Sequence, residues 1–269
     1  RTPTNTPLPT ATPTPLFEKK LIAFYSARTG AYEIFVMNSD GTGVKQLTFD
    51  SQDSRAPTWS PDGTQIVYQS IKHGDYEIFI VDLNGNVKQV TNNGCNDYAP
   101  AWSPDGQYFA YYSDCDGNRD IYTMQIDGTH VRQLTFTDTA YNWFPLWSPD
   151  GTEITYSSNL SGKYHVMVIP ASGGTARKLQ RGCISAFFPD GKKIAYTTYC
   201  MDYGNIMVMN ADGSDVRTIY SKDNATNPHP TSDGKWIVFQ AINGDNDDIW
   251  IMSVDGSNLT RLTTDPAKD

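Results

Sequence analysis

One stretch of about fifteen residues recurs along the chain and limits the fold more than any other feature. Its clearest copy is APTWSPDGTQIVYQS at residues 56–70. It returns as APAWSPDGQYFAYYS from Ala99, PLWSPDGTEITYSS from Pro145, SAFFPDGKKIAYTT from Ser185 and, more altered, PHPTSDGKWIVFQA from Pro228. An apolar run, a tight turn and a short further run follow each copy, so the chain is one unit repeated.

The spacing of the repeats predicts the architecture. The second strand of each unit begins at Ile22, Ile66, Phe109, Ile154, Ile194 and Ile237. The intervals of 44, 43, 45, 40 and 43 residues define six units. The units hold short β-branched and aromatic runs, and no amphipathic helical stretch is long enough for a crossover. A period of this length with four strands per unit is typical of a propeller blade, so the 269 residues favour one domain over two.

The third run of each unit supports this interpretation. The six runs are IFVM, IFIV, IYTM, VMVI, IMVM and IWIM, and none alternates apolar with polar residues. Such a strand is covered on both faces. Ser-Pro-Asp-Gly and Asp-Gly pairs supply the turns. We therefore predict an all-β, six-bladed propeller of four-stranded antiparallel blades over residues 17–269, with repeats starting near 17, 56, 99, 144, 184 and 227.

The pattern PxWSPDGxxIxYxS, followed by a run such as EIFVM, then DG and QLT, resembles the WD40-like (PD40) repeats of TolB-like six-bladed propellers. The resemblance spans residues 17–264. It implies the fold strongly and the function weakly, because such propellers serve as periplasmic or extracellular protein-binding platforms and as gating domains of peptidases. The second role needs a hydrolase domain with a Gly-x-Ser-x-Gly turn, which this sequence lacks.

Composition excludes some partners. With 30 acidic and 21 basic side chains, the net charge of −9 repels nucleic acid and anionic lipid. No run of 18 apolar residues exists, so the sequence predicts no membrane-spanning helix. The sequence begins with Arg1 rather than Met, which favours a removed leader or a fragment of a longer protein.

The first sixteen residues, RTPTNTPLPTATPTPL, differ from the rest. Five Pro and six Thr predict an extended, solvated arm or linker. The first repeat has no good inner strand, because Pro15 occupies the position where three other repeats have Trp59, Trp102 and Trp147. Three outcomes stay open: the arm fills its own slot, it fills the slot of another copy, or a final strand has been lost. The candidate assembly residues are Pro13, Thr14, Pro15, Leu16 and Phe17.

The four cysteines predict two disulfides, Cys95–Cys115 and Cys183–Cys200. Each pair flanks the first two strands of one repeat, at loops on the same end of adjacent strands. Four free thiols or a four-sulfur metal site are the alternatives, but the two repeats are not neighbours and neither pair has zinc-knuckle spacing. Disulfides indicate an oxidising compartment, and therefore export.

No catalytic constellation is recognisable, and we predict no enzymatic activity and no cofactor. Acids precede the third strand in four repeats: Glu33, Glu77, Asp120 and Asp248. One interpretation is a partial ring of carboxylates at a channel mouth; the other, which we favour, is hydrogen bonding within each loop or pairing with a base such as Arg28 or Arg119. Asp114, Asp116 and Asp120, with a second acidic stretch at residues 245–248, are weak calcium candidates. Asn159, Asn224 and Asn258 begin glycosylation sequons.

These observations predict a non-catalytic protein in the periplasm or outside the cell that binds other proteins, with polymerisation through the donated arm as one form of that function. The alternative is a monomeric binding module for an envelope protein or ligand. A metal-dependent lyase or hydrolase in the propeller channel is a more distant third class.

Overall fold

Antiparallel β-sheets make up the computed structural model, which describes residues 20–72, 74–160, 162–200, 204–244 and 246–269. The predictions for residues 13–17 and for Asp245 concern positions outside the described residues. The first three sheets contain β1 (Leu21–Ser26), β2 (Glu33–Asn38) and β3 (Lys45–Gln46); β4 (Arg55–Trp59), β5 (Gln65–Lys72), β6 (Asp75–Asp82) and β7 (Val87–Gln89); and β8 (Asp97–Trp102), β9 (Tyr108–Ser113), β10 (Asp120–Gln125) and β11 (Arg132–Gln133).

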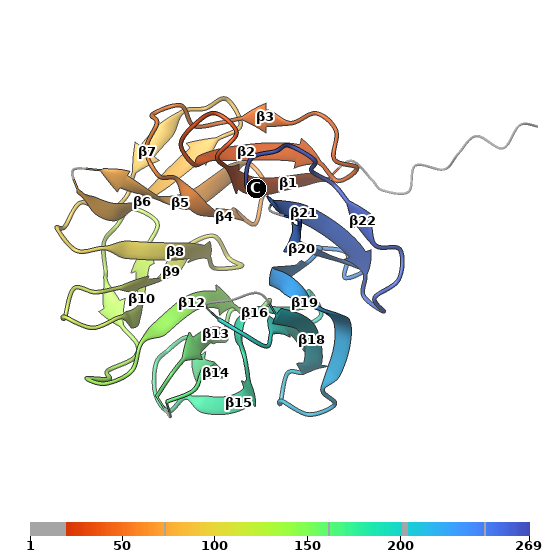
Figure 1. Ribbon diagram of the computed structural model, residues 1–269. Helices are drawn as coiled ribbons and strands as arrows, with labels where there is room; N and C mark the ends of the chain where they lie inside the picture. The colour runs from red at the N-terminus through yellow and green to blue at the C-terminus, as the bar shows by residue number, and fades with distance from the viewer. Residues whose placement is uncertain (1–19, 73, 161, 201–203, 245) are drawn as a thin grey trace, which may run out of the picture.

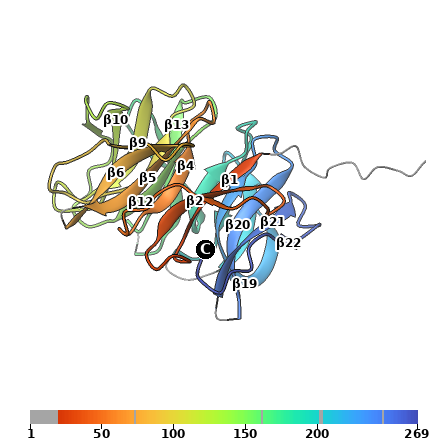
Figure 2. The same ribbon diagram turned by 90° about the horizontal axis from the view of Figure 1, so that it is seen from above.

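The remaining two sheets contain β12 (Asn142–Trp147), β13 (Glu153–Ser158), β14 (His165–Pro170) and β15 (Arg177–Arg181); and β16 (Cys183–Phe187), β17 (Lys193–Thr197), β18 (Gly204–Asn210), β19 (Arg217–Pro230), β20 (Trp236–Asn243), β21 (Asn246–Ser253) and β22 (Thr260–Arg261). The sheets stand around a common centre, and the chain travels once around the ring (Figure 1). In both views β1 lies beside β20 and β21, so the two ends of the described chain meet (Figure 2). The predicted all-β propeller fold is confirmed.

The prediction of separate blades needs one correction, in the last two repeats. The long strand β19 pairs with β18 through its first half and with β20 through its second, which joins both repeats in a seven-stranded sheet. No glycine interrupts the connecting segment, so the strand runs on where a turn was expected. The second and third strands of the unit still form six hairpins among the described residues. A count of six blades stays a prediction.

Burial on both faces explains the uniformly apolar third strands. In β2, Ile34 and Val36 pack in a cluster with Ile66 of the second sheet. Phe35 and Met37 face the other way and pack with Ile249 of β21. Successive side chains of one strand thus contact the sheets on either side, and the first sheet is wedged between the second and the last.

The Ser-Pro-Asp-Gly turn fixes the connection between inner and second strands. The Ser60 hydroxyl donates to Asp62 Oδ1 at 2.6 Å, and the Gln65 amide donates to Ser60 Oγ at 3.0 Å. Gly63 has a φ of 70°, which suits glycine best. Ser103–Asp105 and Ser148–Asp150 repeat the hydroxyl-to-carboxylate bond at 2.5 and 2.6 Å. The most conspicuous motif of the sequence is therefore structural.

Each inner strand also carries a β-bulge. The register shifts in all five described inner strands, next to a residue with positive φ: Ala56, Ala99, Phe144, Ile184 and Asn227. A bulge turns one amide out of the ladder. The turned amide of Ala99 donates to Gln69 Oε1 in the preceding sheet at 2.7 Å. The amide of Ile184 likewise donates to Ser157 Oγ at 2.9 Å, so bulges connect neighbouring sheets.

Candidate functional site

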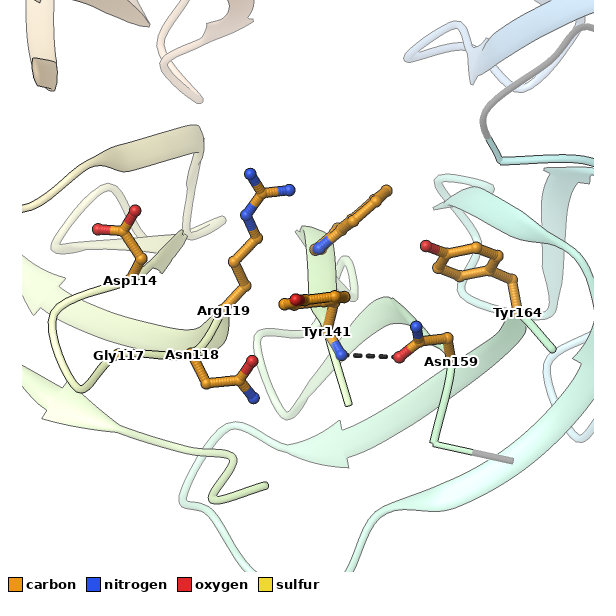
Figure 3. Close-up of a pocket in the computed structure, with 8 residues that line it drawn as sticks. Asp114, Gly117, Asn118, Arg119, Tyr141, Asn159 and Tyr164 are labelled. Carbon is orange, nitrogen blue, oxygen red and sulfur yellow. Dashed lines mark hydrogen bonds between the residues drawn. The ribbon is translucent and has the colours of Figure 1, made fainter. Parts of the chain in front are cut away.

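A pocket of about 480 Å³ lies where the third and fourth sheets meet (Figure 3). It is formed by the β9–β10 loop, the entry to β12 and the β13–β14 loop. Its lining residues are Asp114, Gly117, Asn118, Arg119, Tyr141, Trp143, Asn159 and Tyr164. The volume suits a small molecule or one or two side chains of a partner.

Local interactions hold the β9–β10 loop in place. The Asp114 carboxylate accepts hydrogen bonds from the Asn96 backbone amide at 2.8 Å and from Asn96 Nδ2 at 3.0 Å. Gly117 has a φ of 87°, and its amide donates to the Asp114 carbonyl at 2.9 Å. The Cys95–Cys115 disulfide ties the same loop to the segment before β8. The pocket wall is therefore covalently anchored.

The guanidinium of Arg119 sits among three aromatic rings. Its central carbon lies 5.7 Å from the ring centres of Tyr98 and Tyr141 and 5.3 Å from that of Trp143. These are cation–π distances. Burial raises the pKa of Tyr98 and Tyr164, and the positive charge of Arg119 partly offsets the rise. Among the described residues, no carboxylate lies within ion-pair distance of this guanidinium.

The polar groups of the other pocket side chains differ in whether they form hydrogen bonds within the protein. Asn159 Oδ1 accepts the Tyr141 amide at 2.7 Å, the bond drawn in Figure 3. Asn118 Nδ2 donates to the backbone carbonyls of Thr137 and Ala140. Trp143 is 6% exposed, and its indole N–H is buried without a partner in the part of the chain described. The pocket thus offers both donors, chiefly on Arg119, and acceptors, chiefly on Asp114.

The four acids before the third strands are buried and bonded within their own sheets. A threonine hydroxyl from the end of the same repeat approaches each carboxylate: Thr48 for Glu33, Thr91 for Glu77, Thr135 for Asp120 and Thr263 for Asp248. Arg261 pairs with Asp248 at 2.6 Å. Burial raises the pKa of Glu33, and hydrogen bonds from Thr48 and Ser51 oppose the rise. These carboxylates are engaged in hydrogen bonds within their own repeats.

The bases named as their partners serve elsewhere. Arg28 pairs with Asp269 at 2.6 Å, and Arg119 belongs to the aromatic pocket.

The weak calcium candidates do not converge on one point. Asp114 is bonded to Asn96, Asp116 accepts from Gln133 Nε2 at 2.5 Å, and Asp120 is buried. Within the described ranges, no three His, Cys, Asp or Glu side chains are placed to hold a metal ion.

The sequon asparagines differ in accessibility. Asn224 Nδ2 is engaged with the Ile242 carbonyl at 2.6 Å, and Asn159 lines the pocket. Asn258 is exposed on a turn, where its amide bonds to Ser253 and Ser257. Asn258 is therefore the sequon most open to modification.

Both predicted cysteine pairs form disulfides: Cys95 with Cys115 and Cys183 with Cys200. In the described residues there is no helix of the length and hydrophobicity needed to cross a membrane.

A second candidate site is the edge of the first sheet. The second strands of the other repeats are paired on both sides, whereas β1 pairs only with β2 among the described residues. The last residues of the sequence reach this edge, since the Ala27 amide donates to the Lys268 carbonyl at 3.0 Å. Leu21, at the start of this edge, is 39% exposed. The edge offers backbone groups to an extended segment.

The pocket was not predicted from the sequence. The sequence suggests Arg119 only as a partner for an acid, because the rings around it come from positions outside the repeated motif. The available signal is the aromatic residues at the starts of strands: Tyr98 and Trp143 are the second residues of β8 and β12, and Tyr141 and Tyr164 directly precede β12 and β14.

The geometry defines this chain as a disulfide-linked β-propeller with an aromatic pocket around Arg119 and, among its described residues, a first sheet that has no inner strand beside β1. No family model matches the chain. The Tol-Pal system protein TolB of Desulfosudis oleivorans is 34% identical over 71 residues, which cover 26% of this chain and 16% of that protein.

Solved structures extend the likeness over nearly all of this chain. TolB from Acinetobacter baumannii matches with a TM-score of 0.80 and 23% identity, over 92% of this chain and 64% of that one. A putative TolB from Agrobacterium tumefaciens matches with a TM-score of 0.77 and 22% identity, over 90% of this chain and 89% of that one. The predicted resemblance to TolB-like propellers is confirmed at the level of the fold. This chain covers only 16% of the Desulfosudis oleivorans protein and 64% of the Acinetobacter baumannii chain. Structural likeness at 22% and 23% identity leaves the activity open.

Proposed function

We propose that this propeller is a non-catalytic protein-interaction module that works outside the cytoplasm and binds an extended segment along the open edge of β1. Two disulfides support the compartment, because such bonds persist where the surroundings are oxidising. The open edge supports the binding mode, because an unpaired strand recruits another strand through its main chain.

The register at this edge is the observation that carries the proposal. In a sheet with an inner strand, the residue after the second strand donates its amide to the carbonyl of the residue before the inner strand. In the third sheet, the Asp114 amide donates to the Asn96 carbonyl at 3.3 Å. Ala27 and Lys268 make the same contact at 3.0 Å. Asp269 therefore occupies the first position of an inner strand, equivalent to Asp97.

A second contact agrees with this register. The Asn142 amide, at the first position of β12, donates to the Arg119 carbonyl at 2.9 Å. The Asp269 amide donates to the Asp247 carbonyl at 3.0 Å in the equivalent way. A strand that continues from this point would lie antiparallel to β1 and complete the first sheet.

The occupant we propose is the Thr/Pro arm of another copy, through residues 13–17. Filling by the chain's own arm would need a tight turn directly before Leu21, and the segment LFEKK has neither the Ser-Pro-Asp-Gly motif nor any glycine. Pro13 and Pro15 fall on one edge of a strand, so their missing N–H groups need not face β1. Head-to-tail donation of this kind forms filaments or closed rings.

The test compares the full chain with a version that starts at Phe17, by light scattering and negative-stain imaging. Concentration-dependent assemblies of the full chain alone would support donation of the arm. A peptide of residues 8–17 would bind the truncated chain, and a peptide with the same residues in scrambled order would not. If the full chain is a monomer and the peptide fails to bind, arm donation is wrong. If extended peptides of any sequence also fail, strand binding at β1 is wrong.

A further inference from the structure

We infer that the pocket around Arg119 binds a small ligand whose carboxylate pairs with the Arg119 guanidinium and whose body lies against the rings of Tyr141 and Trp143. This site is separate from the β1 edge, so the inference goes beyond the proposed strand binding and can fail independently of it.

The charge of Arg119 is the first reason. Five arginines of the described chain have a carboxylate within 2.9 Å, and Arg119, Arg132 and Arg181 have none. Among the described residues, the contacts of the Arg119 guanidinium are with aromatic rings, and the guanidinium lines a pocket. A guanidinium offers several N–H donors in a planar fork that matches a carboxylate. Aromatic rings cover its face and leave those in-plane donors unused. The missing partner is a planar anion.

The surroundings of the charge limit that anion to a single carboxylate. Arg119 is the one cationic side chain among the residues that line the pocket, and the Asp114 carboxylate lines it too. Because one positive and one negative charge line the pocket, a dianion such as a phosphate would keep two uncompensated charges there, whereas a single carboxylate would keep one. Asp114 keeps acceptor capacity for a hydroxyl or ammonium group beside the ligand's carboxylate.

The aromatic rings supply the second part of the recognition. Tyr141 is 47% exposed, although aromatic side chains are usually buried. Trp143 and Tyr164 lie 5.3 Å apart between ring centres, and they continue the wall (Figure 3 labels Tyr141 and Tyr164).

The site is also held ready. Arg119 directly precedes β10, whose first residue, Asp120, is fixed by Asn142 Nδ2 at 2.8 Å. The Cys95–Cys115 disulfide anchors the loop on the other side. Little ordering is needed on binding, which favours affinity for a small ligand.

Calorimetric titration of the full, oxidised protein with four probes tests this inference. Phenylacetate and glucuronate each carry a carboxylate, on an aromatic body and on a sugar body; phenylacetamide and glucose are their neutral counterparts. We expect at least one acid to bind at concentrations up to about 10 mM. We expect its neutral counterpart to bind at least about tenfold more weakly. The preferred acid identifies the ligand class.

Variants assign the binding to this pocket. Arg119→Gln is expected to weaken binding of the acid about tenfold or more, and Arg119→Lys should retain part of it. Tyr141→Ala removes the exposed ring and should also weaken binding, while Arg217→Gln, at an exposed arginine paired with Asp215, should change nothing. Circular dichroism melts check that each variant is folded.

Three outcomes overturn the inference: neither acid binds, the neutral counterparts bind equally well, or folded Arg119→Gln binds like the parent protein. If Arg119→Gln does not fold, Tyr141→Ala and the ionic-strength dependence decide. Affinity that does not fall with added salt would then exclude pairing with Arg119.

Discussion

The guanidinium of Arg28 lies 2.6 Å from the side-chain carboxylate of Asp269 and so joins the loop after β1 to the last residue of the sequence. The carboxylate is fully buried, and the arginine side chain is 16% exposed. Arg28 also covers the rings of Phe24 and Phe35, at 5.2 and 5.1 Å. This contact closes the ring of sheets.

Replacing Arg28 by Met should destabilise the protein by about 3–5 kcal/mol, because it leaves the Asp269 carboxylate buried without its cation. Urea unfolding measures the loss. Arg217→Met is the matched control, since its pair with Asp215 is exposed and should contribute less than about 1 kcal/mol. Equal effects of the two variants would contradict the assigned role of Arg28 in ring closure.

Asp97 makes stability depend on pH. Burial raises the pKa of Asp97 to about 6, and the nearby Glu77 charge adds to the rise, although Asn93 donates to the carboxylate at 3.0 Å. The pKa in an unfolded chain is about 3.9. Between these two values the folded protein keeps a proton that the unfolded chain has lost, so the free energy of unfolding falls as pH rises from about 4 to about 6, by roughly 3 kcal/mol.

The neighbouring sheet suggests the test. Asn142 occupies the equivalent position and donates to Asp120 at 2.8 Å. Asp97→Asn should therefore gain stability relative to the parent as pH rises from 4 to 7, while Asn142→Asp should lose it. Urea titrations at several pH values measure both differences. Parallel pH profiles of parent and Asp97→Asn would show that Asp97 titrates normally.

Removing the Cys95–Cys115 disulfide by a double substitution with serine should cost about 3 kcal/mol, from the entropy of the loop that it closes across 20 positions. The same change at Cys183 and Cys200, which are 17 positions apart, is the matched control and should cost nearly as much. Loss of ligand binding at the Arg119 pocket is expected only for the first variant. Thermal melts and calorimetry separate the two effects.

Gln69→Leu should destabilise the protein by about 1–3 kcal/mol, because the buried amide of Ala99 loses its acceptor in the preceding sheet. Ser157→Ala tests the equivalent bond to Ile184 and should have a similar cost. Denaturant unfolding with an unchanged m-value would assign the loss to the folded state. No change in either variant would mean that water replaces these acceptors.

Much of the fold could be predicted because each repeat carries its own local causes. A turn is specified within a few residues by Ser60, Asp62 and Gly63. The burial of β2 on both faces, at Ile34 and Phe35, is indicated by an uninterrupted apolar run. Those signals need no knowledge of distant contacts.

The pocket and the joined sheet could not be predicted in the same way. Arg119, Tyr141 and Tyr164 come from three loops of two repeats, and only the packing of those repeats brings them together. The length of β19 depends on the absence of a turn signal, and a missing signal is harder to interpret than a present one.

The single strand β19 has a mechanical consequence. Fourteen residues of continuous strand run from the rim of one repeat into the interior of the next, so neither repeat can detach while the other stays intact. The earlier repeats follow one another through residues outside the strands, down to the single Gly182 between β15 and β16, and we expect them to loosen more independently. Amide hydrogen exchange should therefore show β16–β22 opening as one cooperative unit, with slower exchange than the other sheets.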